Sequence, residues 1–191
     1  PYAYDGNPAL GELLALVATE DGIHTRAHEH TSLTLEYGTL VPMRYMNPDR
    51  RFKVVSVSAL CMVHDLTDSV QLGRSFRRAI EESYDGSVAF FASGSLSHRF
   101  AQNGRAGEFK HKIWSPFLGE LDHHVVGMWE RGEWSAFTEL LPEYADKAHG
   151  EGFMHDTAML LGALGWDQYR GQVEVVTPYF PSSGTGQINA I

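Results

Sequence analysis

A histidine that follows a short apolar run is the first residue in this chain that could carry acid–base chemistry. Residues 88–92 read VAFFA, and residues 93–98 then read SGSLSH. An apolar strand that ends in small residues would present His98 at the carboxyl edge of a sheet, where ligands of open α/β folds bind. An imidazole can take and give a proton near neutral pH, which favours a general acid or base here. The alternative is a histidine that only hydrogen-bonds the backbone of its turn.

A second group of candidate residues precedes an apolar helix expected at about 153–164. Residues 150–156 read GEGFMHD, so Glu151, His155 and Asp156 offer potential ligands for a hard metal ion. They lie at the N-terminal end of the expected helix, where the helix dipole favours negative charge. Asp156 could equally cap this helix by accepting a backbone N–H. The sequence alone does not decide whether Asp156 is a metal ligand or a helix cap.

Two further motifs carry polar groups with weaker signals. His28 and His30 would share one face of a strand, but their polar surroundings favour an exposed loop. Tyr37 precedes Gly38, and a buried tyrosine at a helix start is the alternative to a functional phenol. There is no Gly-x-Ser-x-Gly elbow, and Cys61 has no evident base beside it, so the sequence does not support nucleophilic hydrolysis.

Strands and helices that alternate in the first half must position these side chains. Sequence patterns predict a helix from Pro8 to Gly22, a short helix at 36–45 and an amphipathic helix from Thr67 to Glu82. The predicted strands cover 23–27, 52–60 and 87–92. This alternation predicts an α/β fold with a layered, central mixed sheet that is partly parallel and flanked by helices.

The second half is predicted to be rich in helix. Helices are expected at 114–131, 133–149 and 153–164, followed by a strand at 172–177. Residues 181–191 are predicted to form a loop with a final strand, and Gly104–Gly107 a mobile loop. No repeat or linker interrupts the chain, so the sequence predicts a single domain over residues 1–191.

Composition narrows the classes of partner. The formal net charge is −9 and the Lys and Arg residues are scattered, which argues against a nucleic-acid surface. No segment reaches the roughly 20 apolar residues that a membrane span needs, and the first residues do not resemble a secretory leader. The lone Cys61 cannot form an intrachain disulfide, so a cytoplasmic location is expected.

Four motifs together resemble the class III extradiol ring-cleavage dioxygenases, and among them the bacterial branch that acts on 3,4-dihydroxyphenylacetate. The motifs are LEYGTLVPMRYM at 35–46, ASGSLSH at 92–98, GEG with MHD at 150–156, and SSGTGQ at 182–187. The resemblance covers essentially the whole chain. It implies a catalytic domain with a non-haem Fe(II) site, Mn or Mg being possible in its place. Dioxygen would be the co-substrate, and the assembly a homo-oligomer.

The resemblance also assigns roles to particular residues. His98 corresponds to the acid–base histidine of the family, which acts from just outside the metal's ligands, and Asp156 to its carboxylate ligand, with Glu151 as the second choice. The family's two histidine ligands lie on an N-terminal segment, and the sequence, which begins without Met, is expected to follow such a segment. Tyr37 is a candidate for hydrogen bonding at the site.

Further residues of the same motifs are candidates for substrate binding. Arg44 and Arg99 could bind the carboxylate of the substrate, and Ser97 lies beside the acid–base histidine. The prediction is therefore extradiol cleavage of a catechol that carries a carboxylate side chain. One alternative is a catalytically inactive structural subunit or a truncated chain. Another is a zinc-dependent hydrolase or lyase whose ligands are His28 and His30 with either Asp156 or Glu151.

Overall fold

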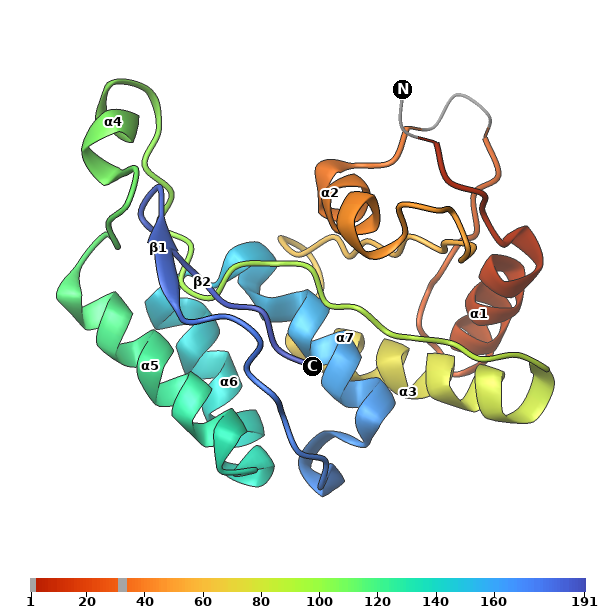
Figure 1. Ribbon diagram of the computed structural model, residues 1–191. Helices are drawn as coiled ribbons and strands as arrows, with labels where there is room; N and C mark the ends of the chain where they lie inside the picture. Colours follow the sequence, from red (N-terminus) through yellow and green to blue (C-terminus); the bar gives the residue numbers. More distant parts are fainter. Residues whose placement is uncertain (1–2, 31–33) are drawn as a thin grey trace. The chain divides into compact units, whose positions relative to one another are not determined.

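The computed structural model describes residues 3–30 and 34–191, and its backbone divides into two compact units. The first unit holds the residues up to Ser93 together with Ala158–Leu164, and the second holds Gly94–Thr157 and Gly165–Ile191. Figure 1 shows the elements of each unit. Residues 1–2, at the start of the stretch compared with a secretory leader, lie outside the described residues. The single catalytic domain stays a prediction.

Helices build the first unit: α1 (Pro8–Glu20), α2 (Tyr37–Met46), α3 (Leu66–Ser83) and the C-terminal part of α7 (His155–Leu164). The predicted start of α1 is confirmed, because the Asn7 side chain accepts a hydrogen bond from the Leu10 N–H at 3.3 Å. Apolar residues at helical spacing on α1 and α3 pack into one core. This core contains Leu10, Leu14, Val17, Ala18, Leu72, Phe76 and Ala79.

Helix α3 approaches α7 closely within this unit. A Cβ added at Gly73 of α3 would meet the Met159 carbonyl oxygen and lie 2.8 Å from the Ala163 N, and one added at Gly162 would meet the Val70 carbonyl oxygen. These contacts are shorter than any that real Cβ atoms make. The two glycines therefore allow the helix backbones to approach each other.

The second unit combines two long helices with short elements. Helices α5 (Pro116–Glu130) and α6 (Trp134–Ala148) are joined by a short turn and pack against each other (Figure 1). The short elements are η1 (Asn103–Arg105), α4 (Ala106–Phe109), η2 (Glu151–Met154), η3 (Trp166–Gln168), β1 (Phe180–Ser182) and β2 (Thr185–Gln187). Residues 104–107, predicted to be a mobile loop, thus belong to η1 and α4.

The sheet content differs from the prediction. Among the described residues the sheet is an antiparallel hairpin in which β1 pairs with β2, Phe180 opposite Gln187. The predicted strands at 23–27, 52–60, 87–92 and 172–177 are not formed there; isolated bridges join Gly6 to Val54 and Val175 to Ala190. An extended apolar segment becomes a strand only where a neighbouring segment pairs with its backbone groups. The central mixed sheet is therefore not shown, although the helix-rich second half is confirmed.

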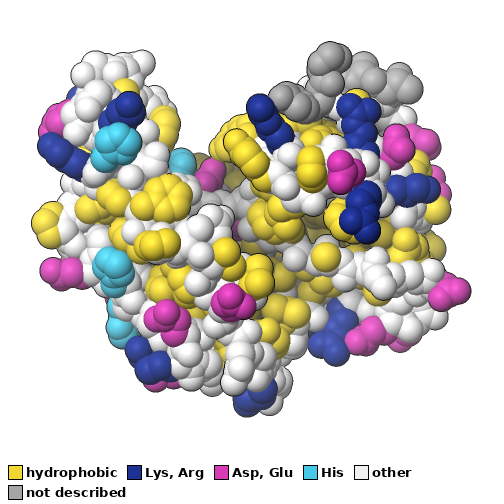
Figure 2. Space-filling view, in the orientation of Figure 1, with side chains coloured by type: hydrophobic (Ala, Val, Ile, Leu, Met, Phe, Trp, Pro, Cys, Tyr) yellow, Lys and Arg dark blue, Asp and Glu magenta, His cyan; other side chains and the backbone are white. Residues whose placement is uncertain are grey.

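The surface of the first unit carries many apolar side chains. Helix α2 has no buried residue. Exposed apolar residues on α2 and on the segment after it include Tyr37, Val41, Tyr45, Met46, Leu60, Met62 and Val63. Figure 2 shows hydrophobic side chains at the surface of this part of the molecule. No helix among the described residues is long and apolar enough to cross a membrane.

Candidate functional site

The backbone groups of the turn that carries His98 form hydrogen bonds to two neighbouring elements, β2 and α6. The Leu96 N–H donates to the Gly186 carbonyl and the Gly186 N–H donates to the Ser97 carbonyl, both at 2.9 Å. This pairing places residues 96–97 beside β2. The His98 N–H donates to the Ala148 carbonyl at the end of α6, at 3.2 Å. The support for His98 is thus the hairpin and α6, rather than the strand predicted at 87–92.

His98 itself is partly accessible, with 31% of its side chain exposed. Its ring stacks on the Phe100 ring, with centroids 5.7 Å apart and planes at 7°. Its Nε2 lies 3.8 Å from Oε1 of Glu151. This separation is too long for a hydrogen bond, but it places a carboxylate where a protonated imidazole would form an ion pair. His98 is therefore accessible from the solvent side, with the Glu151 carboxylate beside it.

Glu151 is fixed by the same turn. Its Oε2 accepts a hydrogen bond from the Ser95 N–H at 2.6 Å, and its own N–H donates to the Ser95 carbonyl at 3.4 Å. The next two residues, Gly152 and Phe153, have left-handed backbones with φ of 54° and 52°. A bulky residue in this region is strained, and such strain is found at functional sites.

Asp156 lies in the first turn of α7 and contacts Gly94 of the turn that carries His98. A Cβ added at Gly94 would lie 2.8 Å from its Oδ2, so a larger residue at position 94 would displace the carboxylate. Its Oδ1 accepts from the Thr157 N–H at 2.7 Å. Burial raises the pKa of the Asp156 carboxyl, the Thr157 N–H lowers it, and the charge of Glu151 raises it. The alternative in which Asp156 satisfies an amide of its own helix is thus supported by a contact.

These contacts bring three predicted residues to one turn. Gly94 contacts Asp156, Ser95 binds Glu151, and Glu151 faces His98. Iron(II) sites of the two-histidine, one-carboxylate class need two imidazoles besides the acid. Among the described residues no three His, Cys, Asp or Glu side chains are grouped to hold a metal ion. The residues present therefore fit one part of such a site, the carboxylate.

The histidines of the zinc alternative belong to a different unit. His28 and His30 are exposed in the first unit, with ring centroids 5.9 Å apart, whereas Glu151 and Asp156 belong to the second unit. The described residues give no group of three that would include them. This alternative has no geometric support.

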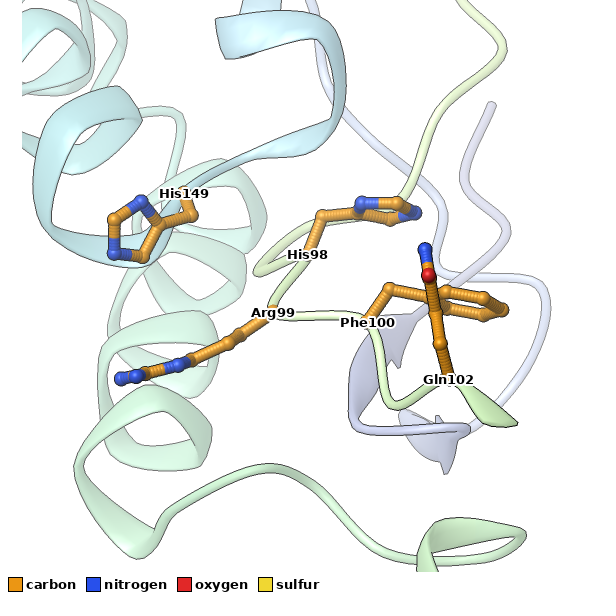
Figure 3. Close-up of a pocket in the computed structure, with 5 residues that line it drawn as sticks. All are labelled: His98, Arg99, Phe100, Gln102 and His149. Carbon is orange, nitrogen blue, oxygen red and sulfur yellow. The ribbon is translucent and has the colours of Figure 1, made fainter. Parts of the chain in front are cut away.

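An open depression of about 510 Å³ lies in front of His98, lined by His98, Arg99, Phe100, Gln102 and His149. In Figure 3 the Arg99 and His149 side chains extend on one side of the depression, while His98 faces Phe100 on the other. The Arg99 guanidinium stacks on the Trp114 ring at 4.8 Å from its centroid.

Sequence reasoning had not singled out Gln102 or His149. His149 has a left-handed backbone with φ of 50° at the end of α6. Histidine is several-fold enriched in this conformation among residues other than glycine. No sequence motif marks His149 as a residue of the site.

The remaining predicted residues have different surroundings. Ser97 is fully buried and its hydroxyl donates to Asp122, so a contact with substrate stays a prediction. Tyr37 and Arg44 belong to α2 in the first unit, and their roles also stay predictions. Tyr37 is 69% exposed, which contradicts the alternative of a buried tyrosine at the helix start.

Comparison with known proteins finds a matching family and several similar proteins. The family described as the catalytic LigB subunit of aromatic ring-opening dioxygenase matches residues 1–191. The chain is 53% identical over 179 residues to 3,4-dihydroxyphenylacetate 2,3-dioxygenase of Escherichia coli, which is 94% of this chain and 64% of that protein. It is 25% identical over 166 residues to Protein CA_C1420 of Clostridium acetobutylicum, 86% of this chain and 33% of that protein. The chain thus spans less than two thirds of the length of either relative.

Proposed function

The chain belongs to the family of the catalytic LigB subunit of aromatic ring-opening dioxygenases, and we therefore propose that it acts in extradiol ring cleavage of a catechol with a carboxylate side chain. The 53% identity to an enzyme named for 3,4-dihydroxyphenylacetate supports this class of substrate. In the reaction, the ring bond next to the diol breaks and both atoms of O2 enter the product, a ring-opened semialdehyde. No further reductant is needed.

His98 is proposed as the acid–base residue. A catechol loses protons when it binds and a proton must return before the ring opens, and one imidazole near neutral pH can serve both transfers. The partial exposure of His98 and the position of Glu151 at 3.8 Å support this role. Neither the exposure of His98 nor its distance to Glu151 depends on the strand that the sequence predicted at 87–92.

The carboxylate of the substrate is proposed to bind Arg99. Arg99 lines the same depression as His98 and is exposed, and its guanidinium stacks on Trp114. A planar guanidinium held by an aromatic ring can still offer its N–H groups to a carboxylate in its own plane. Arg44, in the first unit, is the second candidate.

Fe(II), with Mn or Mg possible in its place, belongs to the same proposal, and Glu151 or Asp156 would hold it. When bound, the metal would bring the catechol and O2 together and supply the redox chemistry. The described residues do not group two imidazoles with these carboxylates, so they supply the carboxylate part of such a site alone.

The remaining expectations are also part of this proposal. They are a cytoplasmic location, a homo-oligomer and the layered mixed sheet. The parallel bridge between Gly6 and Val54 and the β-branched sequence at 52–60 support the sheet.

The test is oxygen uptake by the natural full-length polypeptide, of which these residues are part or whole, after anaerobic loading with Fe(II). We expect uptake with 3,4-dihydroxyphenylacetate that clearly exceeds uptake with catechol, because only the former offers a carboxylate to Arg99. His98→Phe should reduce turnover by roughly 10²–10⁴-fold while the bound iron stays unchanged. His24→Phe, at an exposed histidine of the first unit, is the matched control and should keep full turnover.

Each alternative predicts a different result. An inactive subunit would show no uptake with any catechol, although it folds normally. A zinc enzyme would bind zinc in preference to iron and show no uptake. Unchanged turnover of His98→Phe would remove the acid–base assignment and leave the dioxygenase proposal in place.

A further inference from the structure

A buried carboxylate lies directly beneath the turn that carries His98. Asp122 of α5 is fully buried and accepts four hydrogen bonds, two on each oxygen. Its Oδ1 accepts from the Ser97 N–H at 3.1 Å and from the Tyr144 hydroxyl at 2.8 Å. Its Oδ2 accepts from the Ser97 hydroxyl at 2.7 Å and from the Tyr179 hydroxyl at 2.8 Å. No Lys, Arg or His in the described part of the chain forms an ion pair with it.

A carboxylate in such a position is costly. Burial raises the pKa of the Asp122 carboxyl above its ordinary value, although the four hydrogen bonds lower it. Burial and the adjacent Asp122 also raise the pKa of the Tyr144 phenol, so this group remains a donor. Buried ionic groups are often less favourable than apolar side chains of the same size. An acid at this position offers what an apolar residue could not, namely acceptors for the four donors around it.

What Asp122 does is join three separate segments. Ser97 belongs to the His98 turn, Tyr144 to α6, and Tyr179 to the segment that leads into β1. Two of the four bonds go to Ser97, the residue directly before His98. A Cβ added at Gly186 of β2 would meet Oδ2 of Asp122, so the hairpin that pairs with the turn also closes on this carboxylate.

We propose that Asp122 is a positioning residue for His98: by binding both the N–H and the hydroxyl of Ser97, it fixes the turn that holds the imidazole beside Glu151. This inference depends on the proposed function in one respect, the acid–base role of His98. Preorganisation of this kind affects the reaction rate strongly, because a displacement of about 1 Å at a reacting group can cost about 100-fold.

The first test compares two substitutions of Asp122 in the iron-loaded full chain. Asp122→Leu has similar size but accepts no hydrogen bond, so kcat should fall by roughly 30–100-fold while KM changes by less than about threefold. Asp122→Asn can keep all four contacts. Its amide oxygen accepts from Ser97 N–H and Tyr144, and its NH2 donates to the oxygens of Ser97 and Tyr179. It should therefore restore most of the lost kcat.

A matched pair of serine substitutions controls for general loss of stability. Ser97→Ala removes a buried hydroxyl that donates to Asp122, and Ser75→Ala removes a buried hydroxyl that donates to Asp21 at 2.6 Å in the first unit. Both should lower stability similarly. Only Ser97→Ala should lower kcat, by roughly 3–10-fold, and this pair decides the question if Asp122→Leu does not fold.

Amide hydrogen exchange gives a readout that needs no turnover. Exchange at residues 95–98 should rise at least about tenfold in Asp122→Leu and in Ser97→Ala, while the amides of α1 keep their wild-type rates. Asp122→Asn should keep these four amides protected. The inference is overturned if folded Asp122→Leu, or Ser97→Ala when Asp122→Leu does not fold, leaves both kcat and this local exchange at wild-type values. If the wild type cleaves no catechol, the proposed function fails, and the exchange data still decide whether Asp122 fixes the turn.

Discussion

At the scale of single residues, the two carboxylates proposed as metal ligands, Glu151 and Asp156, differ in their contacts. Glu151 is 23% exposed, and its Oε1 points to His98 while Oε2 is bound by Ser95 N–H. Asp156 is bound by the N–H of its own neighbour Thr157 and is pressed against Gly94. The motif comparison placed Asp156 first and Glu151 second. We propose the reverse order, because the Glu151 carboxylate faces the proposed acid–base residue, His98.

This order is tested by metal binding. Glu151→Gln should weaken Fe(II) binding by at least about 100-fold, since a direct ligand is lost and partners of ligands alone account for about 10–100-fold. Asp156→Asn, which keeps an oxygen for the Thr157 N–H, should weaken it by less than about tenfold. Iron content after anaerobic dialysis measures both, with circular dichroism as the control for folding. A larger loss in Asp156→Asn would restore the order given by the motifs.

At the scale of elements, the sequence was a good guide to helices and a poor one to the sheet. Helices such as α1 and α3 were predicted because apolar spacing is a local signal, to which the Asn7 cap and Gly22 add in α1, and because the hydrogen bonds of a helix lie within the same segment. The segments at 52–60 and 87–92 have strand composition, but strand pairing depends on distant residues that no local pattern specifies.

The residues of the candidate site also fall into two groups: those that a local sequence motif reveals and those that only the fold brings to the site. His98 and Glu151 could be found from motifs, since small residues and a histidine stand together in the sequence. Asp122 and His149 could not, because a lone aspartate within α5 and a histidine after α6 carry no local signal. Their importance arises only when α5, α6 and β2 bring them beside the turn.

The packing of α3 on α7 offers a prediction about elements. Gly73→Ala should lower the free energy of unfolding by about 1–3 kcal/mol, the usual cost of overpacking, because the new Cβ would meet the backbone of α7. Gly107→Ala in α4 is the control: a Cβ there meets no atom within 4 Å, and the change should stay within about 0.5 kcal/mol. Urea denaturation measures both. Equal stability of the two variants would contradict the close approach of the helices.

At the scale of the whole molecule, which has a formal net charge of −9, stability is expected to change with pH as acidic groups take up protons. Each unit holds an aspartate with an altered pKa, and the two shifts have opposite directions. In the first unit the Ser75 hydroxyl, followed by Arg78, lowers the pKa of Asp21. In the second unit burial raises the pKa of Asp122. The two groups should therefore change stability in opposite senses with pH.

The sign follows from comparison with the unfolded chain, in which an aspartate has a pKa of about 3.9. Asp21 contributes stability that is complete above this value and is lost as pH falls through its lower folded pKa. Asp122 does the reverse: its contribution is complete below the unfolded value and is lost as pH rises through its higher folded pKa. Urea titrations of wild type, Asp21→Asn and Asp122→Asn between pH 3 and 7 separate the two contributions to stability. Asp21→Asn should lose most relative to wild type near pH 7 and converge with it in acid. Asp122→Asn should instead gain relative to wild type as pH rises, because it carries no charge to bury. If both variants showed the same slope against pH, the buried acid beneath His98 would not be the costly group that its surroundings indicate.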